Sequence, residues 1–294
     1  GLPVQAPSPE VGMELYDLEH GLKSVSSAGN VLNCQELTGM QAGLTLLKGR
    51  EKYPQIYFWG KIFGQTLDYY IAFGLRDTDF EFPSKDFFYA GEDFEFKPLP
   101  RLTEEVADKI IEIVSEKEKP FTGKFDALLE EPVDGEPPPD DGEDQGDKPA
   151  KLTEVDRLAQ VVQEIDFDTA VVPKGAHSLN EAHVVVTSSD FKGLGLTEAT
   201  SVSKYVHFRP PTSVACLRAL ARSDIQFYAS FLDSLEGDLP KGCWAVRKDP
   251  SGCLVTLRSL SWPGYVAFHV PGTTRYGGLY FGYAQKSRDL PFIL

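Results

Sequence analysis

Aromatic and β-branched residues are densest in residues 56–75, with few polar positions between them. This pattern is typical of a pleated strand surface that is at least half buried. Gly64 and Gln65 lie near the middle of the stretch, and a Gly-X pair between two such runs predicts a two-residue hairpin turn. The rest of the chain is expected to be organised around this hairpin.

The predicted turn fixes how the two strands of this hairpin pair. Counting outward from the turn gives four cross-strand pairs: Lys61 with Asp68, Trp59 with Tyr70, Phe58 with Ile71, and Gly60 with Tyr69. Opposite charges then meet across the strands, and an aromatic ring covers the gap at the glycine. A slip of one residue would exchange the two faces of the hairpin.

The predicted register separates an apolar face from an aromatic face. The apolar face carries Ile56, Phe58, Ile62, Leu67, Tyr69, Ile71 and Phe73 around Gly60. The other carries Tyr57, Trp59 and Tyr70 beside the Lys61–Asp68 pair, and is too aromatic for plain solvent. We therefore predict that Tyr57, Trp59 and Tyr70 are a candidate partner interface, the alternative being that both faces are covered within the same chain.

Helical spacing appears on both sides of the hairpin. Asn33 followed by Glu36 resembles a capping box, and apolar residues then recur at helical spacing as far as Leu47, so a helix ending near Gly49 is predicted to pack on the apolar face. Two further amphipathic helices are predicted over residues 103–117 and 152–165.

The last fifty residues predict antiparallel strands over 244–248, 253–260, 265–270 and 278–283. The apolar end, residues 290–294, is expected to be tucked into the fold. The predicted fold class is therefore α+β, with antiparallel hairpins and sheets, packed amphipathic helices and a disordered acidic loop between them.

The chain divides into four parts by composition. Residues 1–32 predict a flexible N-terminal arm, 33–125 a helix and hairpin region, 126–151 an acidic, proline-rich disordered loop, and 152–294 a C-terminal α+β region. The two folded regions either stand apart or form one composite domain. Residues 130–149 carry nine acids and one lysine, so this loop contributes -8 of the formal net charge of -15.

The negative charge and the cysteine pattern restrict the function. A surface of pI about 4.8 repels phosphate, which argues against nucleic acid and anionic membranes as partners. The sequence contains no run of eighteen uncharged apolar residues, so it predicts no membrane span. Four singly placed cysteines suit a reducing compartment.

Candidate chemistry is sparse. The five histidines have no zinc-like spacing, and neither a phosphate-binding loop nor a G-x-S-x-G sequence occurs. Cys243 and Cys253 are expected to be buried, inert thiols. We therefore predict no catalytic residue, no metal and no cofactor. The alternative is a soluble enzyme or ligand-binding protein whose site is assembled from distant loops around His207 or Cys216.

The order of several short blocks is informative. Residues 58–64, Phe-Trp-Gly-Lys-Ile-Phe-Gly, and 68–72, Asp-Tyr-Tyr-Ile-Ala, are similar to the hairpin signature of radial spoke head proteins of motile cilia and flagella. Further blocks follow in the order typical of the radial spoke head protein 9 family: 158–165, 171–175, 195–199, 205–210, 231–236, 239–244, 257–264, 276–282 and 289–294. The resemblance covers residues 33–76 and 152–294 and rests on this colinearity. The arm and the acidic loop do not match the pattern.

The resemblance implies a non-catalytic structural subunit of the radial spoke head in the axoneme, assembled in the cytoplasm. Its implied partners are head proteins of the 4 and 6 types and further head subunits, with transient contact to central pair projections. It would help to transmit mechanical signals between the central pair and the dyneins. Head proteins 4 and 6 share the hairpin but end in an acidic tail, where this chain has an apolar segment.

Overall fold

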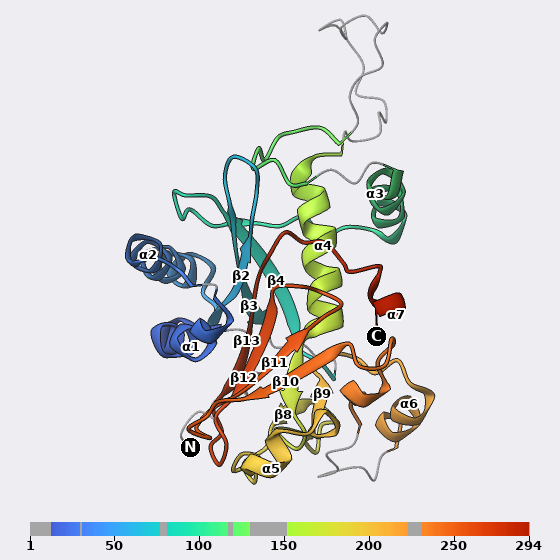
Figure 1. Ribbon diagram of the computed structural model, residues 1–294. Coiled ribbons are helices and arrows are strands. Elements are labelled where there is room, and N and C mark those ends of the chain that lie inside the picture. Colours follow the sequence, from blue (N-terminus) through green and yellow to red (C-terminus); the bar gives the residue numbers. More distant parts are fainter. Residues whose placement is uncertain are drawn as a thin grey trace, which may run out of the picture.

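A nine-stranded sheet forms the centre of the computed structural model, which describes residues 13–29, 31–76, 81–116, 120–129, 152–222 and 231–293 (Figure 1). Its strands are β1 (Met13–Glu14), β2 (Ile56–Ile62), β3 (Tyr69–Arg76), β4 (Ser84–Ala90), β5 (Lys97–Pro98), β10 (Trp244–Lys248), β11 (Val255–Ser259), β12 (Tyr265–His269) and β13 (Tyr276–Gly282). Their order is β10-β11-β12-β13-β2-β3-β4-β5, with β1 beside β2. The predicted α+β class and the four C-terminal strands are confirmed.

Strands β13 and β2 join the two ends of the chain within this sheet. They run parallel, with Tyr280 opposite Gly60, whereas the other neighbours in the sheet are antiparallel. Strands from the predicted 33–125 and 152–294 regions therefore share one sheet and its core.

The predicted hairpin exists, but its predicted register was wrong. Ile62 lies opposite Tyr69 and Lys61 opposite Tyr70, and the register shifts between Phe58 and Gly60. The link between β2 and β3 is thus longer than the predicted two-residue turn. The shift in register is a β-bulge at Trp59. The bulge reverses the alternation of side chains along β2, so Phe58 and Ile62 lie on opposite faces.

Gly60 is required at this bulge by its backbone and its neighbour. Its φ is +155°, and a Cβ atom there would lie 2.1 Å from the carbonyl oxygen of Tyr280. Because the obstacle is backbone of the adjacent strand, a side chain at position 60 would disturb the β13–β2 pairing.

Two helices, α1 (Leu18–Val25) and α2 (Cys34–Glu51), cover one face of the sheet (Figure 1). The predicted capping box is confirmed: the Asn33 side chain accepts from the Glu36 amide, and the Glu36 carboxylate accepts from the Asn33 amide. The predicted flexible arm was wrong for the part that is described. Residues 13–28 form β1, α1 and two short 3-10 helices, Leu15–Asp17 and Ser26–Ala28, because Leu18, Leu22 and Val25 bury their side chains against the sheet.

Helix α4 (Glu154–Thr169) covers the opposite face (Figure 1). Its apolar side chains Leu158, Val162 and Ile165 join the buried residues of β2 and β3. Helix α3 (Glu104–Glu116) lies beside α4. Both helices were predicted, and α4 extends the predicted stripe at its C-terminal end. The sheet is thus the middle layer of three.

A smaller unit with its own apolar cluster lies at the lower end of the sheet in Figure 1. It contains two strand pairs, β6 (Val171–Pro173) with β9 (Tyr205–His207) and β7 (His177–Leu179) with β8 (Val185–Thr187). Its helices are α5 (Leu196–Ala199), α6 (Val214–Leu220) and two 3-10 turns, Val202–Lys204 and Leu235–Gly237.

Helix α7 (Leu290–Ile293) ends the described chain, where the sequence predicted a tucked-in apolar end and no helix. Leu290 is buried, but Phe292 and Ile293 are 88% and 74% exposed, so the prediction of a tucked-in end was wrong for them. Cys243 is buried as expected, whereas Cys253 is exposed in a turn, and all four thiols are free. The acidic segment 130–151 lies outside the described residues. No helix among the described residues has the length and apolar character needed to span a bilayer.

Candidate functional site between β4 and α4

The three residues predicted as a partner interface are buried and lie on two different faces. Tyr57, Trp59 and Tyr70 are 0%, 5% and 3% exposed. The bulge turns Tyr57 and Trp59 toward α4, whereas Tyr70 belongs to the cluster under α2. The structure therefore does not bring the three together, and the chain itself covers both faces of the hairpin. Their role in partner binding stays a prediction.

Tyr70 takes part in a buried charge cluster under α2. Its hydroxyl donates to the Glu36 carboxylate at 2.7 Å, and the Lys61 ammonium lies 2.8 Å from both Glu36 and Asp68. The predicted Lys61–Asp68 ion pair is thus confirmed, although these residues are not opposite each other in the register. Burial acts to raise the pKa of Glu36, but the hydrogen bonds from Lys61, Asn33 and Tyr70 outweigh it and lower the pKa.

Trp59 links the hairpin to the opposite layer. Its indole nitrogen donates to the Asp166 carboxylate of α4 at 3.2 Å, and Lys85 of β4 pairs with the same carboxylate at 2.5 Å. The ring of Phe87 meets the Trp59 ring edge to face, with centroids 6.5 Å apart. These contacts fix the position of α4 over the sheet and shape the surface between β4 and α4.

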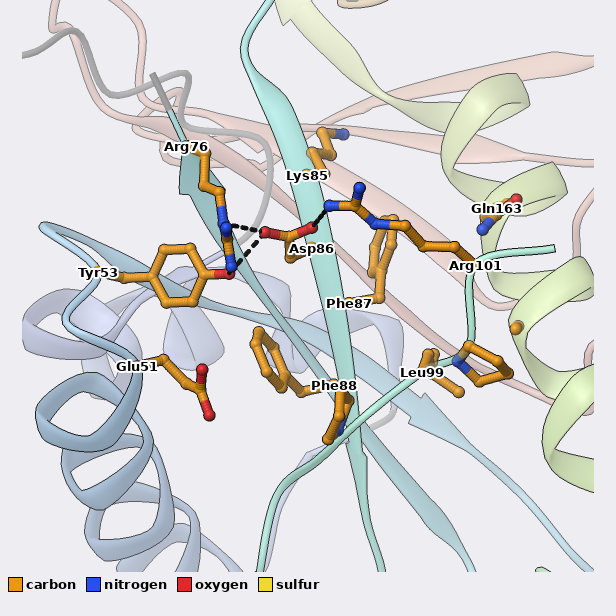
Figure 2. Close-up of a pocket in the computed structure, with 13 residues that line it drawn as sticks. Glu51, Tyr53, Arg76, Lys85, Asp86, Phe87, Phe88, Leu99, Arg101 and Gln163 are labelled. Atoms are coloured by element: carbon orange, nitrogen blue, oxygen red, sulfur yellow. Dashed lines mark hydrogen bonds and ion pairs between the residues drawn. The ribbon is translucent and has the colours of Figure 1, made fainter. Parts of the chain in front are cut away.

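A pocket of about 390 Å³ opens on this surface, and Figure 2 shows Asp86 at its centre. The Asp86 carboxylate accepts a hydrogen bond from the Tyr53 hydroxyl at 2.6 Å and pairs with the Arg76 guanidinium at 2.5 Å. Arg101 pairs with the other carboxylate oxygen. Strand β4 positions the acid, β3 supplies Arg76, and the segments flanking α2 and β5 supply Tyr53 and Arg101.

Each charged side chain that lines this pocket has an ion-pair partner within the chain. Burial acts to raise the pKa of Asp86, but the hydrogen bonds from Tyr53 and Arg101 and the charge of Arg76 outweigh it and lower the pKa. Burial and the bond to Asp86 raise the pKa of Tyr53. No group in this network is left poised to take up or give a proton near neutral pH. The arrangement suits recognition of a surface better than acid–base catalysis.

Metal chemistry has no support in the described ranges. No set of three or more histidine, cysteine, aspartate or glutamate side chains there is placed to hold an ion. We therefore assign no metal to the β4–α4 surface.

The alternative site around His207 or Cys216 is not assembled. His207 is buried, and its Nε2 lies 2.8 Å from Asp238, which also accepts from the Trp244 indole at 2.7 Å. The Cys216 thiol instead lies 3.5 Å from the Leu232 carbonyl, and burial raises its pKa. Cys216 is half-buried, and a thiol with a raised pKa is a poor nucleophile.

The sequence did not indicate the residues of the β4–α4 surface. Asp86, Arg76, Arg101 and Asp166 come from separate segments and follow no known spacing. The only signal was the Lys85–Asp86 pair inside an aromatic run, because charged residues in a strand pattern require partners.

No family model matches the chain. It is 33% identical over 284 residues to the radial spoke head protein 9 homolog of Mus musculus, and 33% identical over 285 residues to that of Danio rerio. The homolog of Homo sapiens is 32% identical over 284 residues. Each comparison covers 96% of this chain and 100% of the relative.

Proposed function

The chain belongs to the radial spoke head protein 9 family, and we propose that it is a non-catalytic structural subunit that supports assembly of the radial spoke head. In the axoneme of motile cilia and flagella it would carry mechanical signals between the central pair and the dyneins. The observation that carries the proposal is similarity along the entire length of the curated relatives, which are named for the spoke head.

The charge network of the β4–α4 surface supports a structural role. Asp86 and Asp166 bind together β2, β3, β4 and α4 through hydrogen bonds and ion pairs. These bonds resist relative movement of the sheet and α4, and a load-bearing subunit needs such resistance. The same pairing leaves the pocket without a free catalytic group.

We propose other head subunits as partners, including those of the 4 and 6 types, with assembly in the cytoplasm and transient contact with central pair projections in the axoneme. The end of α7 supports such contacts, because its neighbouring residues Phe292 and Ile293 are 88% and 74% exposed. Adjacent large apolar side chains that are this exposed are typical of a surface that a partner covers.

Fractionation of ciliated cells tests the proposal directly. The protein is expected in the salt-resistant axoneme, and co-expression with head proteins of the 4 or 6 type is expected to yield a defined complex. Recovery in the soluble ciliary matrix, without association to other spoke proteins, would contradict it and favour the alternative of a soluble enzyme or ligand-binding protein.

A further inference from the structure

Arg209 is an arginine without an acidic partner beside the β4–α4 surface. It follows β9, and its guanidinium carbon lies 4.0 Å from the centroid of the Phe167 ring. Its Nε is buried and makes no hydrogen bond, and no carboxylate of the described ranges lies within ion-pair distance. In a chain with 44 acidic and 29 basic residues, an unpaired and partly buried guanidinium is unexpected.

The acids close to Arg209 are held by other groups. Asp166, on one side, is paired with Lys85, and Asp168, on the other side, lies 2.9 Å from the Lys286 ammonium. Asp238 accepts from His207 and Trp244. None of these three acids forms an ion pair with Arg209.

An apolar hollow of about 190 Å³ adjoins this guanidinium. Its walls are mainly aromatic rings and prolines: Phe82, Pro83, Phe87, Phe167, Phe208 and Pro210. Pockets for whole small molecules measure about 300–1,000 Å³, so this hollow is sized for a single side chain. Phe167, which forms the wall under Arg209, is 45% exposed although it is a large aromatic residue.

We propose that Arg209 and this hollow bind a segment of another spoke head subunit through one carboxylate and one adjacent apolar side chain. The carboxylate would accept two parallel hydrogen bonds from the guanidinium, and the apolar side chain would fill the hollow between the prolines and rings. The inference rests on the proposed function, because the partner is taken to be a spoke head protein.

Two observations favour a carboxylate over other ligands. The Arg209 guanidinium lies over the Phe167 ring, and a guanidinium carries a planar fork of N–H donors that matches the two oxygens of an Asp or Glu carboxylate. The formal charge of -15 repels an acidic segment from most of the surface, so a site for it must carry a local excess of positive charge. Among the charged side chains that line the hollow, only Arg209 provides that excess.

The test compares charge reversal at Arg209 with charge reversal at a control arginine. The full chain is assembled with head proteins of the 4 and 6 types, and the Kd is measured for wild type, Arg209→Glu and Arg247→Glu. Arg247 is exposed on the edge strand β10. Arg209→Glu should weaken association about tenfold or more, because it places a carboxylate next to the carboxylate of the partner. Arg247→Glu should leave the Kd unchanged. Arg209→Lys should lose less, because it keeps the charge without the fork.

A thermal melt of each free variant separates folding from binding. If Arg209→Glu does not fold, Arg209→Gln replaces it and should still weaken association relative to wild type. Wild-type Kd values for both folded Arg209 variants would overturn the inference and leave the proposed function standing. Failure of the wild-type chain itself to associate would overturn both.

Carbodiimide cross-linking of the Arg209→Lys complex identifies the occupant. The introduced amine should form an amide with an aspartate or glutamate of another subunit, and mass spectrometry would locate that residue next to an apolar one. A cross-link to a second copy of this chain, or no cross-link at this position while other lysines react, would overturn the assignment.

Discussion

The indole nitrogen of Trp59 donates a hydrogen bond to the Asp166 carboxylate, 3.2 Å away, and so connects the bulge of β2 to helix α4. Asp166 also pairs with Lys85 of β4. One carboxylate on α4 thereby holds two strands of the central sheet. An aromatic side chain that the sequence pointed to as a partner anchor instead fastens two layers of the same chain together.

Replacing Trp59 should destabilise the isolated protein. Trp59→Ser removes a side chain that is only 5% exposed and leaves a cavity, at a cost of about 3–5 kcal/mol in the free energy of unfolding. Urea denaturation measures this cost. Phe292→Ser, at a position 88% exposed, is the control and should change it by less than about 0.5 kcal/mol. A Trp59→Ser variant that keeps full stability yet loses association with head proteins would restore the interface prediction.

Tyr70 and Glu36 should be energetically coupled on the other face of the sheet. The Tyr70 hydroxyl donates to the Glu36 carboxylate at 2.7 Å beneath α2. Tyr70→Phe removes only that hydroxyl and should cost about 1.5–3 kcal/mol, because the acceptor is charged. In a double-mutant cycle with Glu36→Gln, unfolding free energies should show about 0.5 kcal/mol or more of coupling. Additive effects would mean that the two groups do not interact in solution.

Local signals in the sequence predicted where helices and strands occur better than they predicted how the strands pair. The Asn33 and Glu36 pair marked the start of α2 correctly, because a capping box is formed by residues three apart. The register of the hairpin was wrong because the bulge at Trp59 depends on β13, whose Tyr280 faces Gly60 from more than two hundred residues away. A turn rule applied to one hairpin cannot include that neighbour.

The polar surface and the N-terminal elements were missed for different reasons. Asp86, Arg76 and Arg101 meet only in the folded chain, so no spacing identifies them. Helix α1 did leave a signal, because Leu18, Leu22 and Val25 recur at helical spacing and are buried against the sheet. That short stripe was overlooked in a segment rich in proline, serine and glycine.

A side chain at Gly60 should disrupt the pairing of β2 with β13. A Cβ atom at that position would lie 2.1 Å from the Tyr280 carbonyl oxygen, so Gly60→Ala should cost about 2 kcal/mol or more in unfolding free energy. Gly49→Ala is the matched control, since Gly49 lies in α2 and a Cβ there meets nothing within 4 Å. That change should stabilise the protein by about 0.5–1 kcal/mol. Equal effects of both substitutions would contradict the bulge geometry.

His177 should make the protein less stable in mild acid. Burial lowers the pKa of this imidazole to about 3, and its Nε2 lies 3.2 Å from the Tyr276 hydroxyl. The unfolded state, with a histidine pKa of about 6.5, therefore binds more protons than the folded state between these values, and stability falls as the pH drops from about 6.5 toward 3. At pH 5 the loss from this group should be about 2 kcal/mol.

Comparison of wild type with His177→Gln isolates the contribution of this imidazole. Urea denaturation at pH 7 and pH 5 gives the change in unfolding free energy for each protein, and groups such as Glu36 and Asp86 contribute equally to both. The variant should lose about 2 kcal/mol less than wild type between the two pH values. Because His177 contacts the ring of Phe208 in the cluster of the smaller unit, the difference should vanish only if that cluster admits water. Equal losses in the two proteins would therefore show that His177 is hydrated and charged in the folded state at pH 5.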